Sequence, residues 1–208
     1  MDEQIVCFKR DILLGHLPKS QVFYDETVWH LILNDLLVLS RSEAEKNERY
    51  KQLIAYILIR CGQSYFTYRR TGRLGDERLR QKYSIGFGGH INVTDTDKDQ
   101  LSLFGTEEKG KDFILQAVLR EIREELTIKE SINKPEFISF INDDSNEVGK
   151  VHFGIVWLLK INNLQNIGKR EKGMSELRFY DLPSLLSKKT VFETWSQLLI
   201  DHFIKRGI

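Results

Sequence analysis

The fold is decided by residues 113–128, which read FILQAVLREIREELTI. Apolar residues recur there at helical spacing, so a helix of 3.6 residues per turn would gather them into one stripe that can pack on a sheet. The stripe consists of Leu115, Val118, Leu119, Ile122 and Leu126. We therefore expect a helix over residues 113–128 with one face buried.

Three glutamates lie on a neighbouring face of this predicted helix. Glu121, Glu124 and Glu125 are spaced i, i+3 and i+4, so their side chains converge. Like charges at this spacing repel one another, and hard cations such as Mg²⁺ prefer oxygen ligands. The spacing is equally consistent with a solvated face, because Arg120–Glu124 and Glu125–Lys129 are i, i+4 pairs of opposite charge. Both interpretations remain open on spacing alone.

Strand-like runs surround the helix. We expect strands at residues 4–9, 53–59, 65–68, 136–141, 151–160 and 177–180, a turn at 61–63, and helices after Pro183 and around 191–204. Residues 28–39 form one mixed apolar stretch, and residues 41–49 are interpreted as a solvated helix or loop and nothing more. Several strands, one central helix and one terminal helix predict an α/β (α+β) fold.

Composition narrows the class of protein. The chain has 208 residues and 31 Lys+Arg against 30 Asp+Glu, so its formal charge of +1 argues against a broad nucleic-acid surface. No stretch reaches the roughly 20 apolar residues that cross a bilayer, which argues against membrane insertion. Two cysteines, Cys7 and Cys61, and no apolar leader favour a reducing cytoplasm.

Residues 120–128, REIREELTI, resemble the core of the Nudix box, G-x5-E-x7-R-E-U-x-E-E-x-G-U, where U is a bulky aliphatic residue. The matching positions are Arg120, Glu121, Ile122, Glu124, Glu125 and Ile128. Thr127 stands where the box has glycine, and Asp112 stands where it has its first glutamate. Gly88-Gly89 resembles the family's Gly-Gly turn but lies further upstream, which an inserted polar loop over residues 92–109 explains.

Two further segments sharpen the resemblance and its implications for fold. Residues 84–92 and 142–152 are similar to a poorly characterised branch of predicted Nudix phosphoesterases. The resemblance implies an α/β/α sandwich with a mixed sheet, a carboxylate-bearing central helix and a C-terminal helix. Residues 52–208 would form the catalytic domain, and residues 1–51 an N-terminal extension packed on the same unit. The implied activity is Mg²⁺-dependent cleavage of a diphosphate linkage in a nucleoside diphosphate joined to another group.

The resemblance also implies roles for individual residues. Glu121, Glu124, Glu125 and the carbonyl of Gly88 would hold Mg²⁺, with Mn²⁺ as the alternative. The catalytic carboxylates would be Glu124, Glu125 and Glu147, with Asp143 and Asp144 as further candidates for the general base. Arg120 would orient Glu121. The predicted substrate-binding residues are Arg69, Arg70, Lys82, His90 and Gly89, with Arg73 in the same basic loop.

Two other functions keep the same fold. One is a non-catalytic module that binds a nucleotide-derived ligand and regulates a partner; the intact glutamates argue against it. The other is isoprenoid diphosphate isomerisation, for which Cys61, at an expected turn, is a poor candidate nucleophile. His152 is interpreted as an ordinary polar residue of a strand. The first fifty residues could serve an interaction or dimerisation, so a homodimer stays open.

Overall fold

The glutamate-bearing helix forms, with shifted ends. In the computed structural model, helix α3 spans Glu107–Glu125, so it begins and ends earlier than the periodicity predicts. The next residues, Leu126–Ile128, form strand β8, which pairs antiparallel with β11 (Ile167–Lys169). This pairing overrides the helical pattern, because tertiary context commonly outweighs local propensity. The expected stripe is largely confirmed: Leu115, Val118, Ile122 and Leu126 are buried, and Leu119 is half-buried.

The structure describes residues 2–71, 81–95, 106–170 and 173–207, and they divide between two compact units. The first unit draws on Met1–Tyr56, Gly88–Arg120 and Ile138–Val156. The second draws on Ile57–Phe87, Glu121–Phe137 and Trp157–Ile208. Part of the predicted polar insertion (residues 96–105) and part of the basic loop with Arg73 lie outside the described residues.

In the first unit, strand β1 (Gln4–Lys9) lies between two antiparallel partners. It pairs with β3 (Leu37–Ser40) on one side and with β4 (Tyr50–Cys61) on the other. Strand β2 (Val22–Phe23) pairs with β9 (Glu136–Ile141) at Phe140 and Ile141. Aromatic rings fill this unit: Phe8 and Phe140 both meet the ring of Phe153, with centroids 5.3 and 5.4 Å apart.

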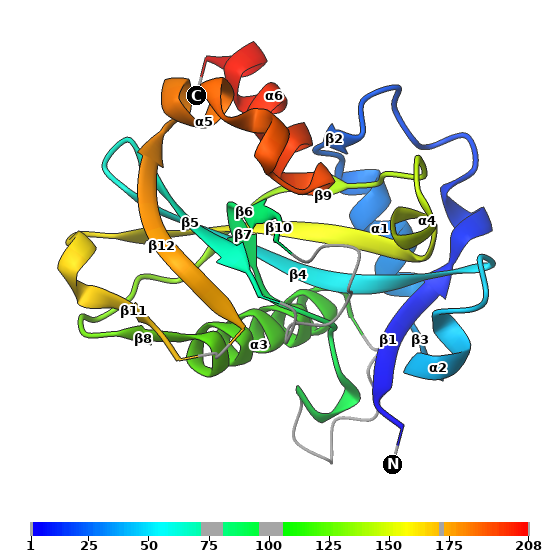
Figure 1. Ribbon diagram of the computed structural model, residues 1–208. Helices are drawn as coiled ribbons and strands as arrows, with labels where there is room; N and C mark the ends of the chain where they lie inside the picture. The colour runs from blue at the N-terminus through cyan, green and yellow to red at the C-terminus, as the bar shows by residue number, and fades with distance from the viewer. Residues whose placement is uncertain (1, 72–80, 96–105, 171–172, 208) are drawn as a thin grey trace. The chain divides into compact units, whose positions relative to one another are not determined.

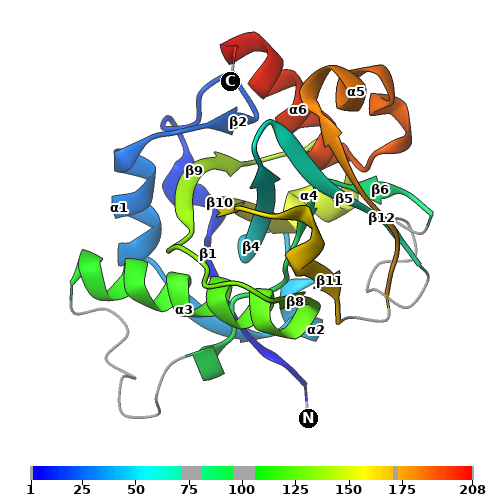
Figure 2. The same cartoon turned by 90° about the vertical axis from the view of Figure 1, so that its left-hand side faces the viewer.

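Helix α1 (Glu26–Asn34) packs on the first turns of α3 within the same unit, as Figure 2 shows. A Cβ added at Gly110 would lie 2.8 Å from a methyl carbon of Leu33, so the helices approach closely because this position lacks a side chain. Lys111 binds Glu107 at 2.6 Å, and its ammonium group lies 5.6 Å from the ring centre of Trp29. Among the residues that the structure describes, the remaining helices of this unit are α2 (Arg41–Ala44) and α4 (Glu147–Val151), and its 3₁₀ turns are Arg10–Leu13 and Val93–Asp95.

In the second unit, β5 (Ser64–Arg70) pairs antiparallel with the end of β4 and with β12 (Met174–Asp181). The short strands β6 (Tyr83–Ser84) and β7 (Gly86–Phe87) pair with β5 and β4 respectively. Helices α5 (Leu182–Ser187) and α6 (Thr194–Arg206) follow β12, as the orange and red ribbons of Figure 1 show. Phe203 of α6 stacks on Tyr65 of β5 at 5.7 Å, so the terminal helix covers this strand. The described part of this unit also holds two 3₁₀ turns, Leu164–Asn166 and Lys189–Val191.

Most expected strands are confirmed, and the fold is a mixed α+β fold with a large sheet and helices, as predicted. Strands β1 and β9 coincide with the expected residues 4–9 and 136–141, and β10 (His152–Ile161) is shifted by one residue. The apolar stretch 28–39 proves to hold the end of α1 and the start of β3. None of the helices that the structure describes is both long and apolar enough to cross a membrane.

Candidate functional site

The predicted carboxylate cluster lies at the C-terminal end of α3, in the second unit. Glu121 is 6% exposed, Glu124 is exposed and Glu125 is half-buried. Their i, i+3 and i+4 spacing on an observed helix puts the three side chains on one side of its last turns. The cluster therefore spans from the protein interior to solvent, as a site that admits both a cation and a soluble ligand would require.

The last turn of α3 is held by Arg170. The guanidinium Nη1 of Arg170 donates to the carbonyl of Arg123 at 2.6 Å, and its backbone N–H donates to the carbonyl of Glu125 at 2.8 Å. These carbonyls have no partner inside a helix that ends here, so Arg170 satisfies groups that would otherwise need water. Thr127, which replaces the glycine of the Nudix box, pairs with Gly168 in the β8–β11 ladder. A strand that starts directly after the helix thus takes the place of a glycine cap.

Tyr68 of β5 connects the cluster with one predicted substrate-binding residue. Burial raises the pKa of Tyr68; the charge of Arg70 lowers this pKa and that of Glu125 raises it, so both groups lie within electrostatic range of the phenol. Arg70 Nη1 lies 3.4 Å from the Tyr68 hydroxyl. A cationic and an anionic side chain therefore lie near one buried ring in the second unit.

The neighbouring cations have different surroundings. Arg69 Nη1 binds Glu176 at 2.7 Å, and Tyr83 donates a short hydrogen bond to the same carboxylate. Glu176 has a φ of 50° where the β5–β12 register shifts, a backbone conformation that non-glycine residues seldom adopt. The carbonyl of Lys82 accepts from the N–H of Arg70 at 2.9 Å, and its side chain is exposed. Of these cations, Lys82 is the one that reaches furthest into solvent.

The glycine turn lies in the first unit. Gly88 has a φ of 121°, which explains why a glycine occupies this position. The carbonyl of Gly89 accepts from the N–H of Ala55 at 2.9 Å, and His90 forms a bridge with Ile54. Arg120 Nη2 donates to the carbonyl of His90 at 2.9 Å. Arg120 therefore holds the segment that follows the turn.

The acidic loop after β9 separates into structural and exposed carboxylates. Asp143 is buried and accepts from Gln21 Nε2 at 2.8 Å and from the N–H of Ser145 at 3.1 Å. Asp144 binds Lys51 at 2.5 Å and Arg10 at 2.7 Å. Glu147, by contrast, is exposed at the start of α4 and pairs with Lys150 at 3.3 Å.

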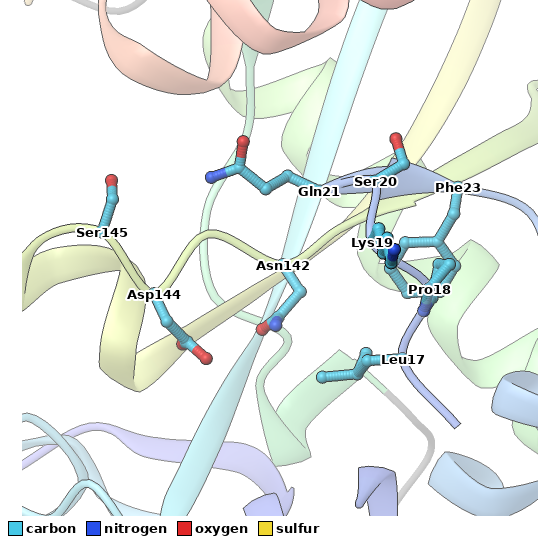
Figure 3. Close-up of a pocket in the computed structure, with 9 residues that line it drawn as sticks. All are labelled: Leu17, Pro18, Lys19, Ser20, Gln21, Phe23, Asn142, Asp144 and Ser145. Carbon is cyan, nitrogen blue, oxygen red and sulfur yellow. The ribbon is translucent and has the colours of Figure 1, made fainter. Parts of the chain in front are cut away.

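A pocket of ≈ 280 Å³ lies between residues 17–21 and the start of this loop, as Figure 3 shows. Its lining residues are Leu17, Pro18, Lys19, Ser20, Gln21, Phe23, Asn142, Asp144 and Ser145. The N–H of Asn142 donates to the carbonyl of Gln21 at 2.9 Å, which joins the two walls. Because Asp144 is engaged by two cations, the pocket offers no spare carboxylate for chemistry.

A second group of possible metal ligands was missed from the sequence. Glu45, His90 and His152 each offer one ligand atom, and these atoms lie within 4.8 Å of one another in the first unit. Burial lowers the pKa of His90 to about 2, and burial also lowers the pKa of His152. His152, interpreted as an ordinary strand residue, and Glu45, assigned to a solvated connector, gave no local signal, because residues far apart in sequence assemble this group.

Comparison with known proteins identifies the fold. No protein-family model matches the chain. The crystal structure of Tm1382, a candidate Nudix hydrolase, superposes with a TM-score of 0.76 at 24% identity and covers 98% of this chain and 99% of that one. The bifunctional NMN adenylyltransferase/ADP ribose pyrophosphatase of Francisella tularensis, in complex with AMP and a Mn ion, has a TM-score of 0.52 at 12% identity, covering 75% and 42%.

The architecture and its glutamate-bearing helix thus define a protein with the Nudix fold, and the predicted resemblance is confirmed at this level. A closer relative is protein YmaB of Bacillus subtilis (strain 168), which is 34% identical over 173 residues, or 78% of this chain and 76% of the relative. The chain belongs to the family of protein YmaB.

Proposed function

We propose that the chain is a Nudix-type hydrolase that uses Mg²⁺, with Mn²⁺ as the alternative, to cleave a diphosphate linkage in a nucleoside diphosphate joined to another group. The observation that carries the proposal is the convergence of Glu121, Glu124 and Glu125 at the end of α3, on a chain with the Nudix fold. A regulatory module that only binds a ligand would not need three adjacent carboxylates that repel one another.

The donor set fits a hard divalent cation. Glu121, Glu124 and Glu125 provide oxygen ligands, which Mg²⁺ and Mn²⁺ prefer, and the exposure of Glu124 leaves room for water and phosphate oxygens. When bound, such an ion neutralises charge on the phosphate oxygens and lowers the pKa of a bound water.

The cations of the second unit would position the substrate. Arg70 lies beside the buried Tyr68 and would present its planar guanidinium to a diphosphate, with which arginine forms paired hydrogen bonds. Lys82 is exposed and would contribute a point charge. Arg69 would bind the substrate after its ion pair with Glu176 opens. Alternatively, it would keep that ion pair and orient β12.

The roles assigned to the first unit follow from the resemblance. Gly88 and Gly89 would allow close backbone approach, His90 would bind substrate, and Arg120 would act through the His90 segment that it holds. Among the loop carboxylates, Glu147 is the preferred candidate for the general base, because Asp143 and Asp144 already serve hydrogen bonds and ion pairs. Glu125 is the alternative base on the helix.

A substrate panel tests the proposal. Nucleoside diphosphates linked to sugars, nucleosides or other groups would be incubated with the full chain and Mg²⁺ or Mn²⁺, and the two products separated by chromatography. We expect metal-dependent addition of water across the diphosphate linkage, with release of a nucleoside monophosphate and the phosphorylated partner group from at least one class of substrate, and no release with a chelator. If calorimetry showed binding of these compounds but no substrate were cleaved, the hydrolase proposal would be wrong and the ligand-binding module would take its place.

A further inference from the structure

Three segments of the first unit bring metal-binding side chains together. Glu45 terminates helix α2, His90 follows the glycine turn, and His152 is the first residue of β10. His152 Nε2 lies 3.9 Å from Glu45 Oε1, and the two imidazole centres are 5.4 Å apart. All three ligand atoms lie within 4.8 Å of one another. Two imidazoles and a carboxylate therefore meet at one point.

Hydrogen bonds prepare both imidazoles as ligands. His152 Nδ1 lies 2.7 Å from the carbonyl of Val148, which can only accept, so Nδ1 carries the hydrogen and Nε2 turns its lone pair toward Glu45. His90 Nε2 lies 2.8 Å from Gln52 Oε1; with Nε2 as the donor of this hydrogen bond, the Nδ1 lone pair of His90 is available. Metal-binding histidines are commonly held by such a bond from the other ring nitrogen.

The buried Gln52 is a second observation that points to a fixed orientation of the His90 ring. Gln52 has no exposed surface, and its Nε2 finds no hydrogen-bond partner within the described part of the chain. A buried donor without a partner costs about 1–3 kcal/mol. An amide that fixes the orientation of His90 accounts for a polar residue at this buried position of β4.

The positive charges close to the group have their own partners. Lys51 Nζ donates to the carbonyl of His152 at 3.3 Å but is bound more tightly by Asp144 and by the carbonyl of Gly149, at 2.5 and 2.7 Å. Arg41 binds Glu3 at 2.8 Å and lies 3.7 Å from Glu45, and Arg120 donates to the carbonyl of His90 at 2.9 Å. Because Lys51 and Arg41 are each balanced by a carboxylate, these two cations oppose a bound ion less than their charge alone suggests.

The donor set selects the type of ion. Imidazole nitrogen suits Zn²⁺ far better than Mg²⁺, and two histidines with one glutamate are a known set of three protein ligands that leaves a fourth position to water. Bonds of about 2.0–2.2 Å would put tetrahedral ligand atoms roughly 3.4 Å apart, so the group must close by up to roughly 1.5 Å. Glu45 is exposed at a helix end and its ion pair with Arg41 Nε is long, at 3.7 Å, so its side chain can make that movement.

We propose that Glu45, His90 and His152 bind one Zn²⁺ ion, which ties helix α2, the segment after the glycine turn and the start of β10 together. This site takes a borderline transition metal, whereas the carboxylates of α3 take a hard cation. The inference does not depend on the proposed hydrolase activity, because the two sites hold different ions with different metal ligands; if zinc binds, His90 serves the zinc ion in place of the substrate.

The test measures zinc directly. The metal-free full chain would be titrated with Zn²⁺ in millimolar Mg²⁺ against a chromophoric chelator, and with Co²⁺ to read the visible spectrum of a tetrahedral site. We expect one ion per chain and a rise in melting temperature on binding. Glu45→Gln should weaken zinc affinity at least about tenfold, because the loss of even a supporting group costs that much. His152→Asn and His90→Asn should do the same.

Two controls separate this site from the rest of the molecule. Glu107→Gln changes a matched carboxylate that lies 3.7 Å from His30, an exposed pair without a second histidine, and should leave zinc affinity unchanged. Glu124→Gln should leave it unchanged as well, even if it abolishes hydrolysis. Since Glu45 is exposed, its variant should fold. No zinc binding by wild type, or equal affinity of wild type and Glu45→Gln, would overturn the proposal.

Discussion

The two candidate sites differ in donor chemistry and in how the backbone carries them. The α3 cluster offers carboxylate oxygens from one helix end, whose last carbonyls are held by Arg170. The Glu45–His90–His152 group combines nitrogen and oxygen donors from three segments of the first unit. A site on a single helix keeps its geometry as long as that helix forms, whereas a group from three segments depends on the packing of all of them. We therefore expect the two sites to bind different metal ions, and we expect the three-segment site to be more sensitive to substitutions elsewhere in its unit.

The largest effect should come from the helix cluster. In the double variant with Glu124→Gln and Glu125→Gln, turnover of any substrate found in the panel should fall by at least about 1,000-fold, because two proposed metal ligands, one of them also a candidate base, lose their charge. The fold should persist, since Glu124 is exposed and Glu125 half-buried. Steady-state kinetics measure the loss and circular dichroism checks the fold.

Glu108→Gln, in the exposed first turn of the same helix, is the matched control and should retain activity. Unchanged turnover in the double variant would contradict the assignment of these glutamates. If the double variant lost zinc affinity as strongly as Glu45→Gln does, the two sites would not be distinct.

The next effect concerns the turn that supports His152. A Cβ added at Gly149 would lie 1.7 Å from the carbonyl oxygen of Asp143, so Gly149→Ala must displace the loop or α4. We expect a loss of about 3 kcal/mol in the free energy of unfolding, the upper range for overpacking. Urea denaturation measures it, and zinc affinity should fall in parallel.

Gly168→Ala provides the comparison for this loss, since a Cβ there meets nothing within 4 Å. Its effect should stay within about 0.5 kcal/mol, as for most surface substitutions. Equal stability of the two alanine variants would show that the loop relaxes at little cost.

The smallest effect is a pH dependence. Burial raises the pKa of Asp144, but the hydrogen bonds and charges of Lys51 and Arg10 together lower this pKa by more than burial raises it. The folded-state pKa of Asp144 therefore lies below 3.8. The stabilisation from Asp144 is therefore complete above pH 3.8 and is lost as pH falls through the folded-state value. In urea denaturation at several pH values, the advantage of wild type over Asp144→Asn should shrink on acidification below this point.

Asp11→Asn replaces an exposed aspartate of the first 3₁₀ turn and is the control. The difference in free energy of unfolding between wild type and this variant should not shrink in the same way on acidification. A wild-type advantage that grows on acidification would reverse the sign of the proposed contribution.

Local patterns predicted much of the fold and the residues of one of the two candidate sites. Helix α3 and its glutamates follow from spacing within one segment, and so do the strands around residues 4–9 and 136–141. The predicted end of α3 was wrong, because residues 126–128 are compatible with both a helix and a strand. Only pairing with the distant strand β11 decides between the two.

The mixed-ligand group could not be predicted in this way. Glu45 stands in a charged run that is typical of a solvated surface, and His152 alternates with apolar residues as any polar strand residue does. Their proximity depends on the pairing of β1 with β4 and on the bridge at His90, which are contacts between distant parts of the chain. No spacing rule within one segment records such contacts.

The pairing of β1 with β4 bears on how this protein can be shortened for experiments. A fragment that begins at residue 52 would match the catalytic domain suggested by the Nudix resemblance, yet it would remove both Lys51 and the whole of β1. The exposed edge of β4 would then lose its partners at Gln52, and Glu45 would be absent. An unpaired strand edge invites association with other chains. A fragment of this kind should therefore aggregate, and any lack of activity in it would say nothing about the glutamates of α3.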